Sequence, residues 1–271
     1  MTEQLIETIE DGVMTLTMNR PEARNALTGE MGAALAEAVQ RGAHDSKVRV
    51  LVLTGAGGAF CAGGDVKGFA ADTSRGAGVG SGSGPSVEQR VAGLRRGMEL
   101  VKWLHEMPKP TLAVIPGPAA GAGLSIALAC DLRISADHAK LTTAFSKVGL
   151  AGDYGGSYFL THLVGAAKVR ELYFTADVIT GAEALKLGIV NKSVPADELP
   201  AAAAAFAKHL AALPTVAVGY MKRNLNAAEH CTLSELLDVE AQNMVRTMMT
   251  EDHAAASKAF VEKRAPTFAG K

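Results

Sequence analysis

The sequence predicts an α/β protein, and three features of the chain indicate this fold class. Short apolar runs of strand length alternate with longer segments of helical composition over residues 1–199. Glycine-rich turns follow several of the predicted strands, as they do where a strand leads into a helix. After residue 200 no strand-like run occurs. We therefore expect a core domain over 1–199 and a C-terminal helical segment over 200–271.

The first predicted elements are a β-hairpin, a helix and a buried strand. Residues 5–10 and 13–18 alternate apolar with polar side chains around Asp11 and Gly12, a pair typical of a two-residue hairpin turn. Thr28 is a good N-cap residue, and the alanine-rich stretch that follows it to about Gly42 favours a helix. The nearly continuous apolar run 48–54 indicates a strand that is buried on both faces.

The middle of the chain contains a low-complexity stretch and a second set of strands. Residues 76–84 are almost entirely Gly and Ser, which cannot bury apolar surface, so we expect a mobile loop there. Helical composition returns over 87–107. Strands are predicted at 111–115 and 132–136, with a helix over 123–129 between them. The composition of the C-terminal segment predicts helices over 201–210, 216–228 and 233–265.

Composition excludes several classes of protein. With 48% hydrophobic and 20% charged residues, the chain is not intrinsically disordered. Its 27 basic and 28 acidic residues leave a net charge of -1, and therefore no global basic field for nucleic acid or an anionic membrane. No apolar run approaches the roughly 20 residues of a membrane span, and the N-terminus lacks a signal-peptide pattern. We expect a cytoplasmic protein with no nucleic-acid or membrane partner.

The three cysteines, Cys61, Cys130 and Cys231, are widely spaced and odd in number. This pattern favours neither a disulfide framework nor a structural zinc site. Cys61 and Cys130 follow apolar neighbours, and we interpret them as small buried hydrophobic residues.

Two glycine-rich turns, residues 55–65 and 115–125, are candidates for a site. Small side chains let backbone N–H groups approach a ligand, and such groups near a helix N-terminus stabilise an oxygen that bears negative charge. Alternatively, the glycines only permit tight turns and close packing. Neither turn has the spacing of a dinucleotide- or phosphate-binding loop. Ser125 lies in an approximate hydrolase nucleophile motif, but it falls inside a predicted helix rather than at the end of a strand.

Asp153 is the candidate acid/base. It lies in an otherwise apolar loop just before Gly155 and Gly156. Desolvation there would raise the pKa of the carboxyl group and suit it to general-base work. The alternative is a structural role, in which Asp153 forms an Asx-turn or caps the following helix.

Several short motifs, spread over the whole chain, occur in a recognisable order. They are residues 19–21 (Asn-Arg-Pro) with 25–27 (Asn-Ala-Leu), 60–65 (Phe-Cys-Ala-Gly-Gly-Asp), 117–123 (Gly-Pro-Ala-Ala-Gly-Ala-Gly), 130–134 (Cys-Asp-Leu-Arg-Ile), 180–184 with 187–190, and 260–264. Together they resemble the enoyl-CoA hydratase/isomerase (crotonase) superfamily. The resemblance implies a crotonase-like ββα superhelix with a C-terminal helical trimerisation segment. It also implies an acyl-CoA thioester substrate, no metal, no cofactor besides the coenzyme A of the substrate, and a homotrimer or dimer of trimers.

The resemblance also implies roles for particular residues. By position, the backbone N–H groups of Gly64 and Ala122 would form an oxyanion hole. Phe260 and Lys263 would reach the CoA of a neighbouring subunit, although Lys263 taken alone is interpreted as a solvated charge on a helix face. The residues that would line the CoA arm are Arg24, Ala26, Ala62, Asp65 and Val66.

The chain departs from the hydratase pattern at two positions. Family members that hydrate enoyl-CoA hold a water between two glutamates, and the corresponding positions here are Ser125 and Phe145. Neither side chain serves unaided as a base near neutral pH, so ordinary hydration is not expected. Asp153 falls where Δ3,Δ2-enoyl-CoA isomerases and phenylacetyl-CoA ring-epoxide isomerases have their single acid/base. We therefore expect an isomerase that converts 3-enoyl-CoA to 2-enoyl-CoA through an enolate. The alternatives are another thioester-enolate reaction, such as epoxide/oxepin isomerisation or weak hydration, and a CoA-thioester-binding protein with little catalysis.

Overall fold

The structure is a computed structural model that describes residues 2–65 and 85–271. Val66 and the loop expected over 76–84 lie outside the described residues. In chain order the described elements are β1 (Leu5–Glu10), β2 (Val13–Met18), η1 (Pro21–Ala23), α1 (Gly29–His44), β3 (Val50–Gly55), α3 (Val87–Gly97), α4 (Glu99–Glu106), β4 (Thr111–Ile115), β5 (Ala119–Ala120), α5 (Ala122–Leu128), β6 (Leu132–Ala136), β7 (Lys140–Thr142), η3 (Phe145–Val148), α6 (Gly156–Thr175), β8 (Ile179–Thr180), α7 (Gly181–Lys186), β9 (Lys192–Val194), α8 (Leu199–Ala211), α9 (Thr215–Ala228), α10 (Leu233–Met248) and α11 (Glu251–Val261).

The strands form two sheets. Six of them lie in the order β1-β2-β3-β4-β6-β9, in which β1 and β2 form an antiparallel hairpin and the remaining pairs are parallel. The hairpin turn is confirmed: Asp11 and Gly12 both have positive φ, as a type I′ turn requires. A second, three-stranded sheet has the order β5-β7-β8, and isolated parallel bridges join Leu27 to Gly64 and Cys61 to Ala119.

The chain passes repeatedly from the large sheet to a short second-layer segment and then into a helix. β2 leads to the bridge at Leu27 and to α1, β4 leads to β5 and α5, and β6 leads to β7 and, after η3, to α6. β3 likewise leads to the second-layer bridges at Cys61 and Gly64. This arrangement is the repeated ββα superhelix that was expected. Because the second-layer segments pair with one another, the loops that precede α1, α5 and α6 lie close together.

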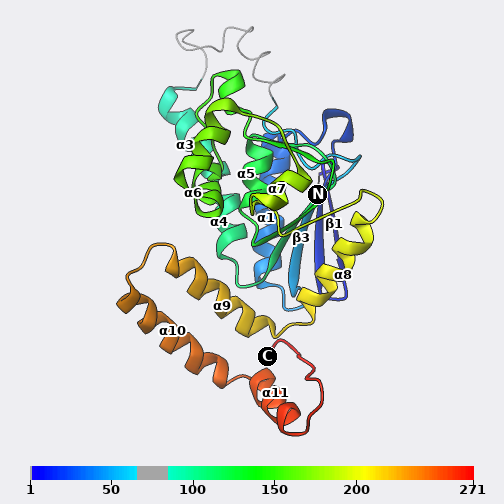
Figure 1. The fold of residues 1–271 in the computed structure, drawn as a ribbon, viewed down its shortest axis with the longest axis vertical. Helices are drawn as coiled ribbons and strands as arrows, with labels where there is room; N and C mark the ends of the chain where they lie inside the picture. The colour runs from blue at the N-terminus through cyan, green and yellow to red at the C-terminus, as the bar shows by residue number, and fades with distance from the viewer. Residues whose placement is uncertain (1, 66–84) are drawn as a thin grey trace.

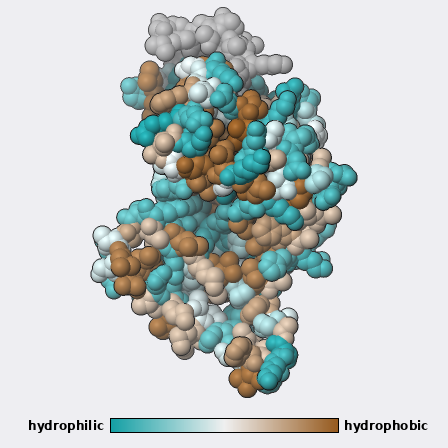
Figure 2. All heavy atoms as spheres, viewed as in Figure 1, coloured by the Kyte–Doolittle hydropathy of each residue, from teal (hydrophilic) through white to brown (hydrophobic). Residues whose placement is uncertain are grey.

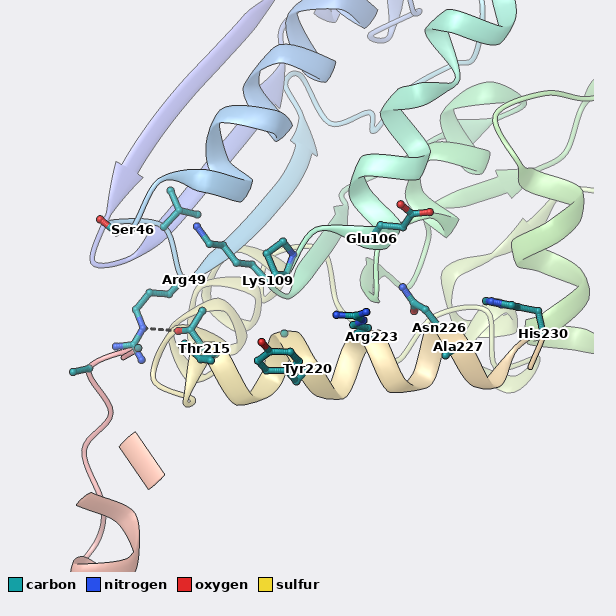
Figure 3. Close-up of a pocket in the computed structure, with 16 residues that line it drawn as sticks. Ser46, Arg49, Glu106, Lys109, Thr215, Tyr220, Arg223, Asn226, Ala227 and His230 are labelled. Atoms are coloured by element: carbon teal, nitrogen blue, oxygen red, sulfur yellow. Dashed lines mark hydrogen bonds between the residues drawn. The ribbon is translucent and has the colours of Figure 1, made fainter. Parts of the chain in front are cut away.

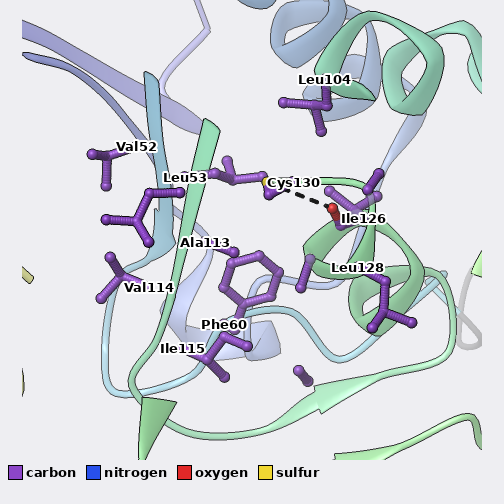
Figure 4. Close-up of a cluster of buried hydrophobic side chains, with 14 of the residues drawn as sticks. Val52, Leu53, Phe60, Leu104, Ala113, Val114, Ile115, Ile126, Leu128 and Cys130 are labelled. Atoms are coloured by element: carbon purple, nitrogen blue, oxygen red, sulfur yellow. Dashed lines mark hydrogen bonds between the residues drawn. The ribbon is translucent and has the colours of Figure 1, made fainter. Parts of the chain in front are cut away.

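The hydrophobic core lies between the large sheet and its helices. All five residues of β4 and all seven of α5 are buried, and Phe60 fills the space between them without any exposed surface (Figure 4). The two cysteines in apolar contexts are buried, as expected. Burial raises the pKa of Cys61 to about 11 and that of Cys130 to about 12, so both thiols stay neutral.

Two helices predicted as continuous are each divided in two. The segment 87–107 forms α3 and α4, which meet at Met98. The segment 233–265 forms α10 and α11, because Thr250 caps a new helix by accepting a hydrogen bond from the amide of His253 at 3.1 Å. Helix α11 ends at Val261, and Lys263 lies beyond it with a φ of 55°.

The C-terminal helices divide into one that covers the sheet and three that extend from it. Helix α8 packs on β2, β3 and β6, whereas α9, α10 and α11 project away from the core (Figure 1). The buried Lys222 on α9 anchors them, since its ammonium donates to the Asp131 carboxylate at 2.9 Å and to the carbonyl of Leu104 at 2.8 Å. No single helix among the described residues is long and apolar enough to cross a membrane, and only α8 and α9, bent by 98°, pass that test as a pair.

Candidate active site

A cavity of about 690 Å³ opens where successive turns of the superhelix lead into their helices. Gly64 follows β3, Ala122 begins α5, and Asp153 precedes α6, and all three residues line this cavity. The structure therefore brings the two predicted oxyanion-hole residues and the predicted acid/base together, although they are far apart in the sequence.

The Gly64 amide is oriented by a hydrogen bond to the neighbouring carbonyl. The amide of Leu27 donates to the carbonyl oxygen of Gly63 at 2.8 Å. In a trans peptide the C=O and the following N–H point in opposite directions. The N–H of Gly64 consequently points away from Leu27. Among the described residues this amide donates no hydrogen bond, so it is available to a ligand in the cavity that Gly64 lines.

The Ala122 amide is oriented in the same way. Ala122 is the first residue of α5, and its N–H is one of the amides that a helix N-terminus leaves without an intrahelical partner. The carbonyl of Gly121, in the same peptide unit, accepts from the Ser125 amide at 3.0 Å and from the Ser125 hydroxyl at 3.2 Å. The N–H of Ala122 therefore points out of the helix end, and no described residue accepts a hydrogen bond from it.

The two glycine-rich turns pack backbone against backbone, which explains their composition. A Cβ at Gly123 would lie 2.4 Å from the carbonyl oxygen of Cys61, a distance that no side chain tolerates. Gly63 adopts a φ of +95°, which L side chains rarely adopt. The packing role of these glycines is therefore confirmed. The amides of Gly64 and Ala122 donate to no acceptor among the described residues, and their role as an oxyanion hole stays a prediction.

The Asp153 carboxyl group is half-buried, and its Oδ1 atom is buried without a hydrogen-bond partner among the described residues. Asp153 does not cap α6, because Gly155 is the N-cap residue of that helix and no side chain caps it. Desolvation raises the pKa of Asp153 above the ordinary value. Burial, reinforced by the Asp153 charge, also raises the pKa of Tyr154 and of Tyr173 to about 12, so both phenols stay neutral.

The residues at the two hydratase glutamate positions have other contacts. Ser125 is buried inside α5, as predicted, and its hydroxyl donates to the carbonyl of Gly121. The ring of Phe145 lines the cavity and stacks on Tyr173, with 6.0 Å between the ring centroids and 22° between the planes. In this structure neither position presents a carboxylate to the cavity.

The residues predicted to line the CoA arm lie beside the Gly64 loop. Ala62 lines the cavity, and its amide donates to the carbonyl of Arg24 at 3.0 Å. The Arg20 guanidinium donates to the carbonyl of Ala26 at 2.7 Å and lies 3.5 Å from the Asp65 carboxylate. Hydrogen bonds thus join Ala62 to Arg24 and Arg20 to Ala26, and an ion pair joins Arg20 to Asp65. Of the four predicted residues, Ala62 lines the cavity itself.

Phe260 and Lys263 do not reach this cavity within their own chain. Both are exposed, with 85% of the Phe260 surface accessible, and they lie on or just after α11 at the opposite end of the molecule (Figure 1). The predicted contact of these two residues with CoA therefore requires a CoA molecule that is bound to a neighbouring subunit.

Sequence reasoning missed two walls of the cavity. One face of α1 and one face of α3 line it, and their signal is a set of small residues at helical spacing: Gly29, Gly32, Ala33 and Ala36 on α1, and Gly93 and Gly97 on α3. The sequence also gave no indication of Tyr173, whose ring packs behind Asp153 against Gly152. Nothing in the local sequence around Tyr173 indicates that contact.

A second cavity, of about 800 Å³, lies between α9 and the core (Figure 3). Two of its basic groups are already occupied: Lys109 donates to the carbonyls of Gly42 and Asp45, and Arg49 donates to Thr215 and to the carbonyls of Leu213 and Phe268. The acidic residue that lines this cavity, Glu106, is exposed, in contrast to the half-buried Asp153. Among the described residues, no three His, Cys, Asp or Glu side chains are grouped so as to hold a metal ion.

Comparison with known proteins agrees with this geometry. The family model for enoyl-CoA hydratase/isomerase matches residues 8–271. The chain is 38% identical to the 1,2-epoxyphenylacetyl-CoA isomerase of Escherichia coli K12 over the full length of both proteins. It is 32% identical to the short-chain-enoyl-CoA hydratase of Clostridium acetobutylicum, over 94% of this chain and 93% of that protein. The crystal structure of an enoyl-CoA hydratase from Polaromonas sp. JS666 superposes with a TM-score of 0.88 at 32% identity, covering 97% of this chain and 99% of that one. The chain belongs to the enoyl-CoA hydratase/isomerase family of acyl-CoA enzymes.

Proposed function

We propose that this enzyme moves the double bond of a 3-enoyl-CoA into conjugation with the thioester, with Asp153 as its only acid/base. One observation carries the proposal. Asp153 supplies a half-buried carboxylate with an unpartnered oxygen to the cavity that Gly64 and Ala122 also line, while Ser125 and Phe145 occupy the positions of the two hydratase glutamates.

The reaction needs only these groups. The thioester oxygen would accept hydrogen bonds from the amides of Gly64 and Ala122. Asp153 would remove a proton from the α carbon, and the electron pair of that C–H bond would pass into a dienolate whose oxygen the two amides stabilise. The same carboxyl group would return the proton at the γ carbon, which gives the 2-enoyl thioester. Every electron pair stays in the substrate, so we propose no cofactor other than the coenzyme A of the substrate.

The raised pKa of Asp153 suits it to this task. A base whose pKa lies nearer to neutrality binds the transferred proton more strongly and is still ionised at neutral pH. Hydration differs because a second group must activate the water. Ser125 is bound to the Gly121 carbonyl and Phe145 has no basic atom, so neither supplies that group.

A second candidate reaction is the isomerisation of a ring epoxide attached to CoA. It is favoured by the 38% identity to the E. coli 1,2-epoxyphenylacetyl-CoA isomerase over the whole chain. It would use the same polarised thioester and the same carboxylate, and an assay with both substrates distinguishes the two reactions.

The test is an assay of the purified enzyme with a 3-enoyl-CoA, a 2-enoyl-CoA and a ring-epoxide acyl-CoA. We expect the first to give conjugated product, followed by its ultraviolet absorbance, and the second to give at most slow hydration. Fast hydration without conjugation of the 3-enoyl substrate would contradict the proposal. Turnover of the ring epoxide alone would establish the second candidate. Tight binding of all three without turnover would identify a CoA-thioester-binding protein.

We also propose that the chain assembles as a homotrimer or dimer of trimers through its C-terminal helices. Helices α9, α10 and α11 expose many large apolar side chains, and Figure 2 shows several apolar residues on the visible face of this region, among polar ones. Exposed apolar patches of this kind mark association surfaces. Such an assembly would place Phe260 and Lys263 beside the CoA of a neighbouring subunit. Sedimentation that shows a stable, fully active monomer would contradict it.

A further inference from the structure

Asn25 is a fully buried polar residue in the loop that precedes α1. Its side-chain amide donates to the carbonyl oxygens of Ala56 and Ala59, both at 2.9 Å. Its side-chain oxygen accepts from the amide of Arg20 at 2.8 Å. The residue has a φ of +56°, which asparagine adopts more readily than most side chains. Asparagine combines two donors, an acceptor and tolerance of this conformation, and Asn25 uses all of them.

These bonds join the loop over 24–27 to the loop over 55–64. Two backbone hydrogen bonds complete the connection: Ala62 donates to Arg24 at 3.0 Å, and Leu27 donates to Gly63 at 2.8 Å. The second bond holds the peptide unit that contains the N–H of Gly64. The Asn25 side chain thus holds the start of the loop directly, at Ala56 and Ala59. It acts on the end of the loop indirectly, because Leu27, two residues further along the chain, bonds the carbonyl of Gly63.

We propose that Asn25 is a positioning residue for the Gly64 amide, acting through the Leu27–Gly63 hydrogen bond. The inference rests on the proposed function, because it assumes that this amide polarises the thioester carbonyl. Asn25 itself faces the protein interior and does not touch the substrate. Its loss would turn the Gly64 amide away from the carbonyl oxygen while leaving the amide of Ala122 and the carboxylate of Asp153 in place.

The test uses the full-length variants Asn25→Gly and Asn25→Ser. Glycine keeps the backbone conformation and removes all three side-chain hydrogen bonds, whereas serine keeps one hydroxyl donor. Ser193→Ala is the matched control, because it removes a single side-chain bond, from Ser193 to the Asp137 carboxylate, on the edge strand β9 far from the cavity. The readouts are kcat and KM with a 3-enoyl-CoA, and the infrared carbonyl stretching frequency of a bound saturated acyl-CoA labelled with ¹³C at the thioester.

Removing one oxyanion donor typically lowers kcat by about 10²–10³-fold, so we expect a displaced donor in Asn25→Gly to lower kcat by roughly 10–100-fold. We expect KM to change less than kcat. The carbonyl frequency, lowered on binding to the unmodified enzyme, should return toward its free value in Asn25→Gly and part of the way in Asn25→Ser. Ser193→Ala should leave the frequency and kcat unchanged.

The outcomes separate this inference from the proposed function. A folded Asn25→Gly variant that binds the thioester with an unaltered carbonyl frequency would overturn the positioning role. If both variants lose the fold, Asn25 is a folding residue, and the inference is equally overturned. If the unmodified enzyme binds acyl-CoA without any change of carbonyl frequency, the proposed function itself fails, whatever the variants show.

Discussion

The substitution Asp153→Asn should abolish most of the activity and at the same time stabilise the fold. A positioned acid/base contributes about 10²–10⁴-fold to a reaction rate, so kcat should fall by that factor. Stability should move in the other direction at neutral pH. Desolvation raises the folded-state pKa of Asp153 above 3.8, so the folded protein binds this proton more tightly than the unfolded chain does. Stability therefore falls as pH rises from the unfolded to the folded pKa, and the loss is complete above both.

The size of the stability gain follows from the burial. An unsatisfied buried polar group costs about 1–3 kcal/mol. Asparagine keeps an oxygen at the site of Oδ1 but removes the charge, so we expect it to recover about 1 kcal/mol of this cost. That gain corresponds to a rise in Tm of roughly 2–4 °C for a chain of this size. The gain should disappear as the pH is lowered toward the unfolded-state pKa.

The assay combines conjugation of a 3-enoyl-CoA, the Kd for a saturated acyl-CoA and thermal unfolding at several pH values. Asp197→Asn is the control, because Asp197 is exposed and lies outside the cavity. We expect the control to match the unmodified enzyme in all three measurements. The reasoning is refuted if Asp153→Asn turns over normally, or if it is no more stable than the unmodified protein at pH 7.

Three further predictions follow from the same contacts. The pH profile of kcat/KM should show an acid limb with its midpoint above 3.8, since only the ionised form of Asp153 accepts a proton. A midpoint at or below 3.8 would argue against Asp153 as the base. Gly123→Ala should lower the free energy of unfolding, measured with denaturant, by about 1–3 kcal/mol and should also lower kcat, because the added Cβ would clash with the Cys61 carbonyl. In the control Gly93→Ala the added Cβ contacts no other atom, so we expect no loss of stability. Ser125→Ala should lower kcat by less than about tenfold, because the Ser125 amide still holds the Gly121 carbonyl; a larger loss would assign the hydroxyl a chemical role.

Much of the fold was predictable because the signals are local. The hairpin at Asp11 and Gly12, the Thr28 cap and the strands β4 and β6 occur where the sequence indicates them. The breaks at Met98 and Met249 were not predicted. Both breaks nevertheless have local signals, since Gly97 precedes the first and Thr250, which caps α11, follows the second.

The candidate site was predictable as a set of residues and unpredictable as a geometry. Asp153 could be singled out from its apolar loop, but the same loop suited a helix cap, and only the folded chain shows Gly155 in that place. The directions of the Gly64 and Ala122 amides depend on bonds from Leu27 and Ser125 to the preceding carbonyls. The Ser125–Gly121 bond has the four-residue spacing of a helix, whereas the spacing of Leu27 and Gly63 along the chain carries no sign of their contact.

The two departures from the hydratase pattern have a common physical consequence. Ser125 uses its hydroxyl to hold the peptide unit of Ala122, and Phe145 uses its ring to form a wall with Tyr173. Each position that could have activated a water instead supports the cavity, in which Asp153 is the half-buried carboxylate, whereas Glu37 is exposed and Glu99 pairs with Arg95. In the proposed reaction, one acid/base that holds the proton close to the substrate would return it to the γ carbon, and no second group would activate a water. We therefore base the proposed isomerisation on the position of Asp153 and on the residues at the two hydratase positions.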